Sequence, residues 1–363
     1  MARRKPRQPA PAAVPTASPT VVDARALVAA QRDGRWVWLA LGLVIALGAL
    51  LAWRHFATLA TRPMTIADQG PAGPVGQCRQ LPPWLTTLGG SPQASLSTSE
   101  RRTKGLVLID PGKAPYQHPS WDDAGWLGPI LLDGHGQVLV GPIPVINVLD
   151  NPPAAQNTLW RVDALSQEMR PLLELPAAAA PGPENPFGIM GQALDCETAS
   201  VYVSSVMGSD RAHERGRLFQ IDPQAGKVVS MREGIDAIGL VLYRGSSGGG
   251  KRLYYGSARR PHVYSLAVAT DGRLEGEPRF EFSIEGAGPR GDDRARRLRI
   301  EPDGSMLLHG VEFSFNLVAP TEKPETPYRL RYDHAAERWR LRMIGQYEVT
   351  GAEGWLQGET APR

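Results

Sequence analysis

Four segments of this chain share one order of short apolar runs and turns, and this repetition limits the folds that the chain can adopt. Each segment has an apolar run, a turn, a run with small or aromatic residues, and two further alternating runs. The segments cover about residues 121–176, 187–233, 235–284 and 294–349, at a spacing of about 45–57 residues. Four antiparallel strands per unit at this spacing are typical of a β-propeller blade, which buries its two sides against neighbouring blades. We therefore predict an all-β fold, a five- or six-bladed β-propeller.

The turns between these runs agree with antiparallel strands. Asp-Gly or Asp-Pro turns occur in IDPQAGK, VATDGR and EPDGS. The stretch GLVLIDPG at 105–112 and the tail around 351–357 lie outside the four segments. We expect strands from these two stretches to complete a shared closing blade, which would leave few exposed sheet edges.

The segment 326–344, TPYRLRYDHAAERWRLRMI, is the clearest strand pair. Tyr, Leu and Trp alternate with five arginines on the two sides of a turn. A period of two places the apolar side chains on one face of a hairpin and the arginines on the other. We interpret the arginine face as a solvated outer face, and an anion-binding stripe is the alternative.

An uncharged stretch of 18 residues, WVWLALGLVIALGALLAW at 36–53, is the longest apolar run of the chain. At about 1.5 Å per residue a helix of this length just spans a hydrocarbon core of roughly 30 Å. Tryptophans at both ends suit the membrane interface, and the basic flank before them predicts a cytoplasmic N-terminus. The sequence thus predicts a single-pass type II signal anchor in the lipid bilayer of the inner membrane, with the C-terminal domain in the periplasm or otherwise extracytoplasmic. A cleaved signal peptide is the alternative.

The net charge of +3 is unevenly distributed. Residues 1–35 carry seven basic and two acidic side chains, a net charge of +5, so the remainder carries −2. The large domain is therefore near neutral, and the basic tail is a topology signal rather than a nucleic-acid site. We expect no nucleic-acid partner.

Both cysteines of the chain, Cys78 and Cys196, lie after the apolar stretch. Their spacing does not fit a zinc site, which uses close Cys pairs. Outside the cytoplasm two such thiols can oxidise and persist as a disulfide. We favour a Cys78–Cys196 disulfide, and two unrelated buried thiols are the alternative.

The third segment carries a family resemblance. The sequence IGLVL, followed by GGGKRLYYGSARRPHVYSLAVATDGRL, resembles the blade consensus of the gluconolactonase-like, strictosidine-synthase-like and royal-jelly/yellow propellers. The resemblance extends over about residues 187–310 and concerns the blade pattern rather than catalytic signatures. It implies the propeller fold.

The same resemblance implies what the centre of the propeller lacks. Gluconolactonase-like enzymes hold a divalent cation in the central channel with a Glu, an Asn and an Asp from inner strands. In this chain Ile238 occupies the Asn position and Arg296 the Asp position. An apolar side chain cannot bind the cation and an arginine repels it. We therefore expect no metal and no cofactor.

Several polar groups remain as candidates. Arg296, Arg297 and Arg299 in ARRLRI lie on a predicted inner strand, where they could attract an anionic ligand. Asp122 and Asp123 begin the first segment and could bind a cation or act as acid and base, although a polar turn is the simpler interpretation. The polar stretch SDRAHERG at 209–216 predicts a mobile, solvated loop rather than a metal site.

No nucleophile elbow, HExxH, CxxC or Walker motif is present in the sequence. We predict a cytoplasmic tail at 1–35, a transmembrane helix at 36–53, a Pro/Gly-rich stalk at 54–103 and a β-propeller at 104–363. The predicted function is a ligand- or protein-binding scaffold of the cell envelope, whose partner is an envelope protein or a small anionic ligand. A lactonase- or hydrolase-like propeller enzyme with a non-standard site is the alternative.

Overall fold

The computed structural model describes residues 73–98, 103–144, 151–182, 184–245, 250–316 and 324–350, together with residues 354 and 356. The chain divides into two compact units, Met1–Pro63 and Met64–Arg363, and every described residue belongs to the second. The predicted tail and the predicted transmembrane helix at 36–53 lie outside the described residues. Within the described ranges, no helix is both long enough and apolar enough to cross a membrane.

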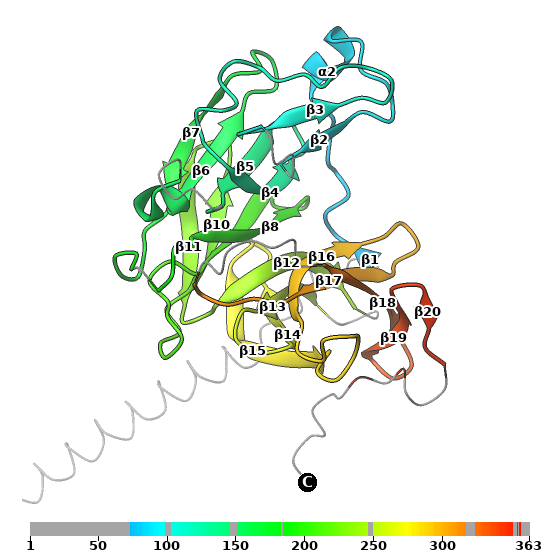
Figure 1. Ribbon diagram of the computed structural model, residues 1–363. Helices are drawn as coiled ribbons and strands as arrows, with labels where there is room; N and C mark the ends of the chain where they lie inside the picture. Colours follow the sequence, from blue (N-terminus) through cyan, green and yellow to red (C-terminus); the bar gives the residue numbers. More distant parts are fainter. Residues whose placement is uncertain are drawn as a thin grey trace, which may run out of the picture. The chain divides into compact units, whose positions relative to one another are not determined.

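Four antiparallel sheets follow one another along the chain (Figure 1). The first blade contains β4 (Leu127–Leu132), β5 (Val138–Pro142), β6 (Thr158–Val162) and β7 (Met169–Glu174). The second contains β8 (Ile189–Asp195), β9 (Ser200–Ser205), β10 (Arg217–Asp222) and β11 (Lys227–Glu233). A short 3₁₀ helix, η2 (Pro153–Asn157), precedes β6.

The third and fourth blades each gain a short fifth strand. The third contains β12 (Ala237–Arg244), β13 (Lys251–Ser257), β14 (His262–Val268) and β15 (Leu274–Ser283), with β1 (Gly73–Pro74) paired to β12. The fourth contains β16 (Arg294–Ile300), β17 (Met306–Val311), β18 (Thr326–Asp333) and β19 (Arg338–Ile344), with β20 (Tyr347–Glu348) paired to β19. These four blades match the four predicted segments.

The first strands of the blades lie side by side as inner strands. Strand β8 packs between β4 and β12, and β12 packs between β8 and β16. This arrangement is that of a β-propeller, so the predicted all-β propeller class is confirmed. We call the side where the inner strands begin the top and the side where they end the bottom.

The predicted count of five or six blades is wrong, because the described residues form four blades and a small extra sheet. Strand β3 (Val107–Ile109), from the stretch expected to close the ring, pairs with β2 (Ser95–Ser97) instead. The C-terminal β20 pairs with β19 of its own blade. Each leftover strand therefore finds its partner close by in sequence, and no shared closing blade forms among the described residues.

The cores of the fold lie between the blades. Tyr243 and Tyr254 of the third blade surround Trp339 of the fourth, with ring centroids 4.9 and 6.0 Å away. The blades approach so closely that a Cβ at Gly256 would lie 2.0 Å from the carbonyl oxygen of Ala295. Only glycine fits there, which explains the small residue within an otherwise aromatic strand.

The segment before the first blade packs against the propeller. The short helix α2 (Pro83–Thr87) buries Trp84 and Leu85, and the Trp84 ring lies 5.6 Å from that of Trp121. Gln80 donates its backbone N–H to the carbonyl of Asp133 at 3.0 Å. The sequence assigns residues 54–103 to a stalk, but residues 73–98 hold apolar side chains that find partners on the blades.

Candidate functional site

Arg296 lies where the inner strands of three blades meet. Its backbone belongs to β16, and its Nη1 donates to the carbonyl oxygens of Ile238 on β12, at 2.8 Å, and of Met190 on β8. Desolvation by burial lowers the pKa of Arg296 to about 10, so the group is still cationic at neutral pH. A guanidinium therefore interacts with the carbonyl edges of the inner strands.

A second side chain acts in the same way between the first two blades. Gln192 on β8 donates its Nε2 to the carbonyl oxygen of Pro129 on β4 at 3.3 Å. The exposed edge of an inner strand has unpaired backbone groups, which need partners when they are buried. Arg296 and Gln192 supply these partners with side chains of the propeller itself.

Aromatic side chains gather at the top, next to this point. Phe313 and Phe315 follow β17, and their rings lie 5.5 Å apart. Phe187 precedes β8, and its ring lies 5.4 Å from that of Phe313. These rings pack with Met190 and Ile238 in one buried cluster. The top of the inner strands is therefore filled by apolar groups.

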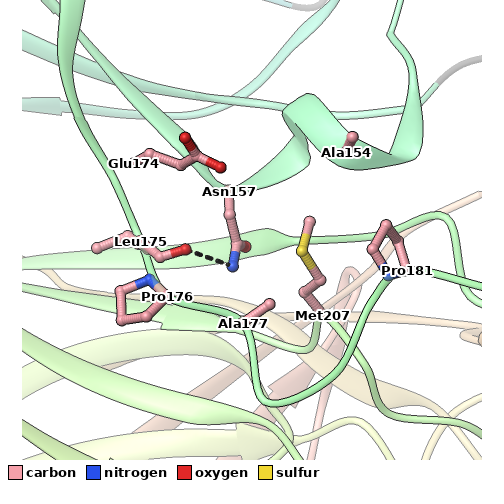
Figure 2. A pocket seen from close by; sticks show the side chains of 8 residues that line it. All are labelled: Ala154, Asn157, Glu174, Leu175, Pro176, Ala177, Pro181 and Met207. Atoms are coloured by element: carbon pink, nitrogen blue, oxygen red, sulfur yellow. Dashed lines mark hydrogen bonds between the residues drawn. The ribbon is translucent and has the colours of Figure 1, made fainter.

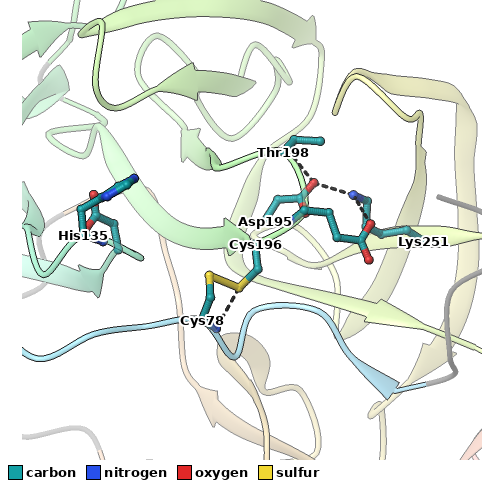
Figure 3. Close-up of a disulfide and its surroundings, with 8 residues drawn as sticks. Cys78, His135, Asp195, Cys196, Thr198 and Lys251 are labelled. Atoms are coloured by element: carbon teal, nitrogen blue, oxygen red, sulfur yellow. Dashed lines mark hydrogen bonds and ion pairs between the residues drawn. A yellow bond between two sulfur atoms is a disulfide. The ribbon is translucent and has the colours of Figure 1, made fainter. Parts of the chain in front are cut away.

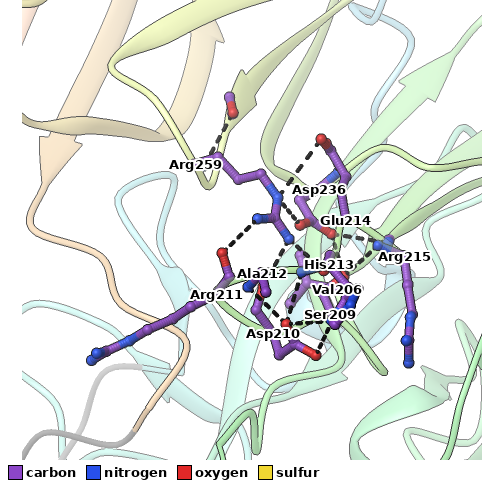
Figure 4. A network of polar contacts seen from close by, with 12 residues as sticks. Val206, Ser209, Asp210, Arg211, Ala212, His213, Glu214, Arg215, Asp236 and Arg259 are labelled. Carbon is purple, nitrogen blue, oxygen red and sulfur yellow. Dashed lines mark hydrogen bonds and ion pairs between the residues drawn. The ribbon is translucent and has the colours of Figure 1, made fainter.

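A polar network borders this aromatic cluster (Figure 4). Asp236, directly before β12, is almost fully buried and accepts hydrogen bonds from the Ser209 hydroxyl, the Gly216 N–H at 2.9 Å and Arg259 Nε at 2.7 Å. Burial raises the pKa of Asp236, against the opposing effects of Ser209 and Arg259. The guanidinium of Arg259 also lies over the Phe315 ring, 5.2 Å from its centroid.

The same network holds the loop that contains SDRAHERG. Arg259 donates to the backbone carbonyls of Asp210 at 2.8 Å, of Arg211 at 3.2 Å and of His213. The hydrogen bond from His213 is the largest of the effects that lower the pKa of Asp210 to about 2. The expectation of a mobile, solvated loop misses these anchors, because they come from Asp236 and Arg259 on the third blade.

The other predicted site residues lie apart from this cluster. Arg297 and Arg299 are well exposed on the opposite side of β16 and pair with Glu325 and Glu301. Asp122 and Asp123 are exposed on the turn before β4. That Arg296, Arg297, Arg299 and the two aspartates bind a ligand stays a prediction.

A cavity of about 340 Å³ opens on the top between the first and second blades (Figure 2). Both polar ends of Asn157 in its wall are engaged, since Nδ2 donates to the Leu175 carbonyl at 3.1 Å and Oδ1 accepts from Ser205 at 2.6 Å. Glu174 contributes the one carboxylate of the lining. The lining residues are Ala154, Asn157, Glu174, Leu175, Pro176, Ala177, Pro181 and Met207.

The bottom of the second blade carries the predicted disulfide, which is confirmed (Figure 3). Cys196 lies in the turn between β8 and β9 and is bonded to Cys78, with a Cα–Cα distance of 5.6 Å. On both sides of Cys196, carboxylates bind the fully buried Lys251: Asp195 at 2.6 Å and Glu197 at 3.0 Å. The bottom of the second blade is thus joined to the segment before the propeller and to the third blade.

No three His, Cys, Asp or Glu side chains of the described ranges lie close enough together to hold a metal ion. The arrangement at the centre is one of internal hydrogen bonds and ion pairs, which can position loops and present a surface.

The chain matches no protein-family model and no curated protein. Among solved structures, a Bacteroides uniformis protein assigned as a 6-phosphogluconolactonase is 12% identical, with a TM-score of 0.41, over 71% of this chain and 69% of that one. The Pseudomonas aeruginosa periplasmic gluconolactonase is 17% identical, with a TM-score of 0.34, over 56% and 53% of the two chains. A streptogramin B lyase is 11% identical, with a TM-score of 0.35, over 80% and 87%. These values carry no argument on activity.

Sequence reasoning missed the Asp236–Arg259 network. Both residues lie in segments whose strands are predicted correctly, but the sequence pattern assigned no role to either. One signal was available: an aspartate directly before an apolar inner strand will be buried, and a buried carboxylate needs a cation or several donors. The basic pair Arg259–Arg260 at the end of the next strand could supply such a cation.

Proposed function

We propose that this chain is a membrane-anchored, extracytoplasmic β-propeller that acts as a binding scaffold in the cell envelope. The anchor is the apolar stretch at 36–53, and the lipid bilayer is its partner there. The observation that carries the scaffold proposal is the position of Arg296. A cationic guanidinium bonded to the carbonyls of two neighbouring inner strands disfavours a divalent cation at that point.

The network at the top supports the same proposal. Asp236, the almost fully buried carboxylate there, accepts hydrogen bonds from an arginine, a hydroxyl and a backbone N–H, and these bonds hold the loop to the third blade. Networks that are satisfied in this way make a surface rigid, and a rigid surface binds a partner with a smaller loss of conformational entropy.

Photo-crosslinking in intact cells tests the scaffold proposal. A photoreactive residue is placed at Leu165, Glu174 or Tyr347, which sample the bottom, the top and the outer edge of the propeller. Leu165 and Tyr347 are 82% and 81% exposed. Discrete adducts are expected from at least one of these positions. The same residue at the fully buried Phe219 is the control and gives none.

Absence of adducts from all three exposed positions would refute the scaffold proposal. So would a purified full chain that retains a divalent cation in one-to-one ratio and hydrolyses lactones. Topology is tested separately, because a reporter enzyme fused after Arg363 that is active in the cytoplasm would contradict the extracytoplasmic placement.

A lactonase- or hydrolase-like activity with a non-standard site is the second candidate function. Its supporting observation is the cavity of about 340 Å³ with Glu174 in its lining. In this case hydrolysis of a lactone by the full chain would be lost in Glu174→Gln and kept in Glu168→Gln, a change at another exposed carboxylate of the same blade. Equal activity of the native chain and Glu174→Gln would exclude the cavity as the site.

A further inference from the structure

Among the residues that the structure describes, the fourth blade has one face without a neighbouring blade. The strands of the first three blades each contribute to two large buried clusters, and the second cluster of the first blade is shared with α2 and β3 rather than with a blade. The strands of the fourth blade contribute Trp339, Leu341 and their neighbours to a single cluster, against the third blade, and Phe315 after β17 joins the cluster at the top. A sheet whose second face is open must make that face polar or cover it.

Arginines occupy this open face, which we call the arginine face. In β18 and β19 they alternate with the buried Tyr328, Leu330 and Trp339. The four main strands of the blade contain nine arginines and no lysine. The arginine face consists of Arg297, Arg299, Arg329, Arg331, Arg338, Arg340 and Arg342.

The carboxylates of the fourth blade neutralise only part of this positive charge. Glu325 pairs with Arg297, Glu301 with Arg299 at 2.6 Å, and Asp303 is 3.9 Å from Arg329. Arg331 and Arg342 form no ion pair with any described residue. These two arginines are therefore available to an external anion.

The pairing of β18 with β19 also brings two of these positive charges close together. Arg331 lies directly opposite Arg340 across the β18–β19 ladder. Like charges at opposed positions destabilise a sheet. An anion bound between them would relieve the repulsion, so the native sheet is arranged to gain from an anionic partner.

We propose that the arginine face binds an acidic polypeptide segment of a partner protein. Arginine binds carboxylates in a planar, two-pronged geometry that lysine cannot form, and arginine is enriched at protein interfaces where lysine is depleted. A bilayer surface attracts either residue about equally, so the absence of lysine favours carboxylates. The internal pairs with Glu301 and Glu325 show that arginines of this face already bind carboxylates, each through one N–O contact. This inference rests on the proposed scaffold function and names the class of its partner.

The test measures binding of a fluorescent oligoglutamate peptide to the full chain in nanodiscs of zwitterionic lipid. The change is Arg331→Gln with Arg342→Gln, at two arginines without an internal ion pair, although Asp303 also interacts electrostatically with Arg331. We expect the dissociation constant to rise about three- to thirtyfold, since exposed ion pairs are modest individually. The matched control is Arg170→Gln with Arg273→Gln, which removes the same charge from exposed positions of the first and third blades.

Three outcomes of the peptide assay overturn the inference. They are equal weakening in the control pair, no binding of the peptide by the native chain, and binding of anionic vesicles or inorganic phosphate without binding of the peptide. Crosslinked adducts that persist unchanged in the Arg331→Gln, Arg342→Gln chain would refute binding at the arginine face. They would leave the scaffold proposal standing. Absence of adducts from every exposed position would refute the scaffold instead.

Discussion

The change Lys251→Met is expected to destabilise the propeller more than its single charge suggests. The Lys251 side chain is fully buried, and Nζ lies 2.6 Å from the equally buried Asp195 and 3.0 Å from Glu197. Methionine keeps the length and apolar stem of lysine but removes the cation. The carboxylate of Asp195 then stays buried with only the Glu197 N–H and the Thr198 hydroxyl as donors, at 3.0 and 2.9 Å.

The expected loss of stability follows from this geometry. Removing one partner of a buried ion pair costs about 3–5 kcal/mol, because the other charge is left uncompensated. For a compact unit of about 300 residues, the unfolding entropy is roughly 0.6 kcal/mol per degree. The melting temperature should therefore fall by about 5–8 °C.

The assay is thermal unfolding by calorimetry at neutral pH with the disulfide intact. A second change, Asp195→Asn added to Lys251→Met, removes the uncompensated charge and should recover part of the loss. The control is Lys227→Met at an exposed position of β11, where the free energy of unfolding should change by less than about 0.5 kcal/mol. A fall of less than 2 °C in Lys251→Met, or a double variant less stable than the single one, would refute this reasoning.

Three further predictions concern titration, covalent structure and topology. A hydrogen bond from His309 is the main cause that lowers the pKa of Glu325 from 4.5 to about 2. The ionised Glu325 therefore stabilises the fold fully above about pH 4.5, and this stabilisation is lost as the pH falls toward 2. Urea unfolding between these pH values should show a shallower pH dependence in Glu325→Gln, and an unchanged slope would contradict this. Non-reducing and reducing gels of the exported chain should differ in mobility, and Cys196→Ser should abolish the difference; labelling of both thiols in unreduced chain would argue otherwise. A reporter enzyme fused after Arg363 should be active only when exported, and activity in the cytoplasm would disprove this topology.

The sequence predicted the blades well, because the strands of each blade are consecutive in the sequence and pair with one another. In 326–344, for example, Tyr328, Leu330 and Trp339 alternate with arginines, and period and turn together define the hairpin without knowledge of its neighbours. The disulfide was also predictable, since a chain with two cysteines allows only one intramolecular pair.

The blade count and the central contacts were not predictable from the sequence, because they depend on contacts between segments that are far apart in the sequence. Strand β3 was expected to pair with the C-terminal tail, yet it pairs with β2, which was hidden in the predicted stalk. Arg296 was recognised as unsuited to a metal. Its bonds to the Met190 and Ile238 carbonyls depend on how three blades pack, and no local pattern encodes that.

The Cys78–Cys196 bond also determines how the molecule bears mechanical load. Tension that passes the β1–β12 pairing and reaches Cys78 is transmitted to the turn of the second blade directly through the two sulfur atoms. The 118 residues between the cysteines include the first blade and the small β2–β3 sheet, and this part of the chain carries no tension while the disulfide is intact. Once that bond is reduced, about 400 Å of chain can be drawn out before the second blade is loaded. A reductant would thus convert a short, stiff linkage into a long, extensible one.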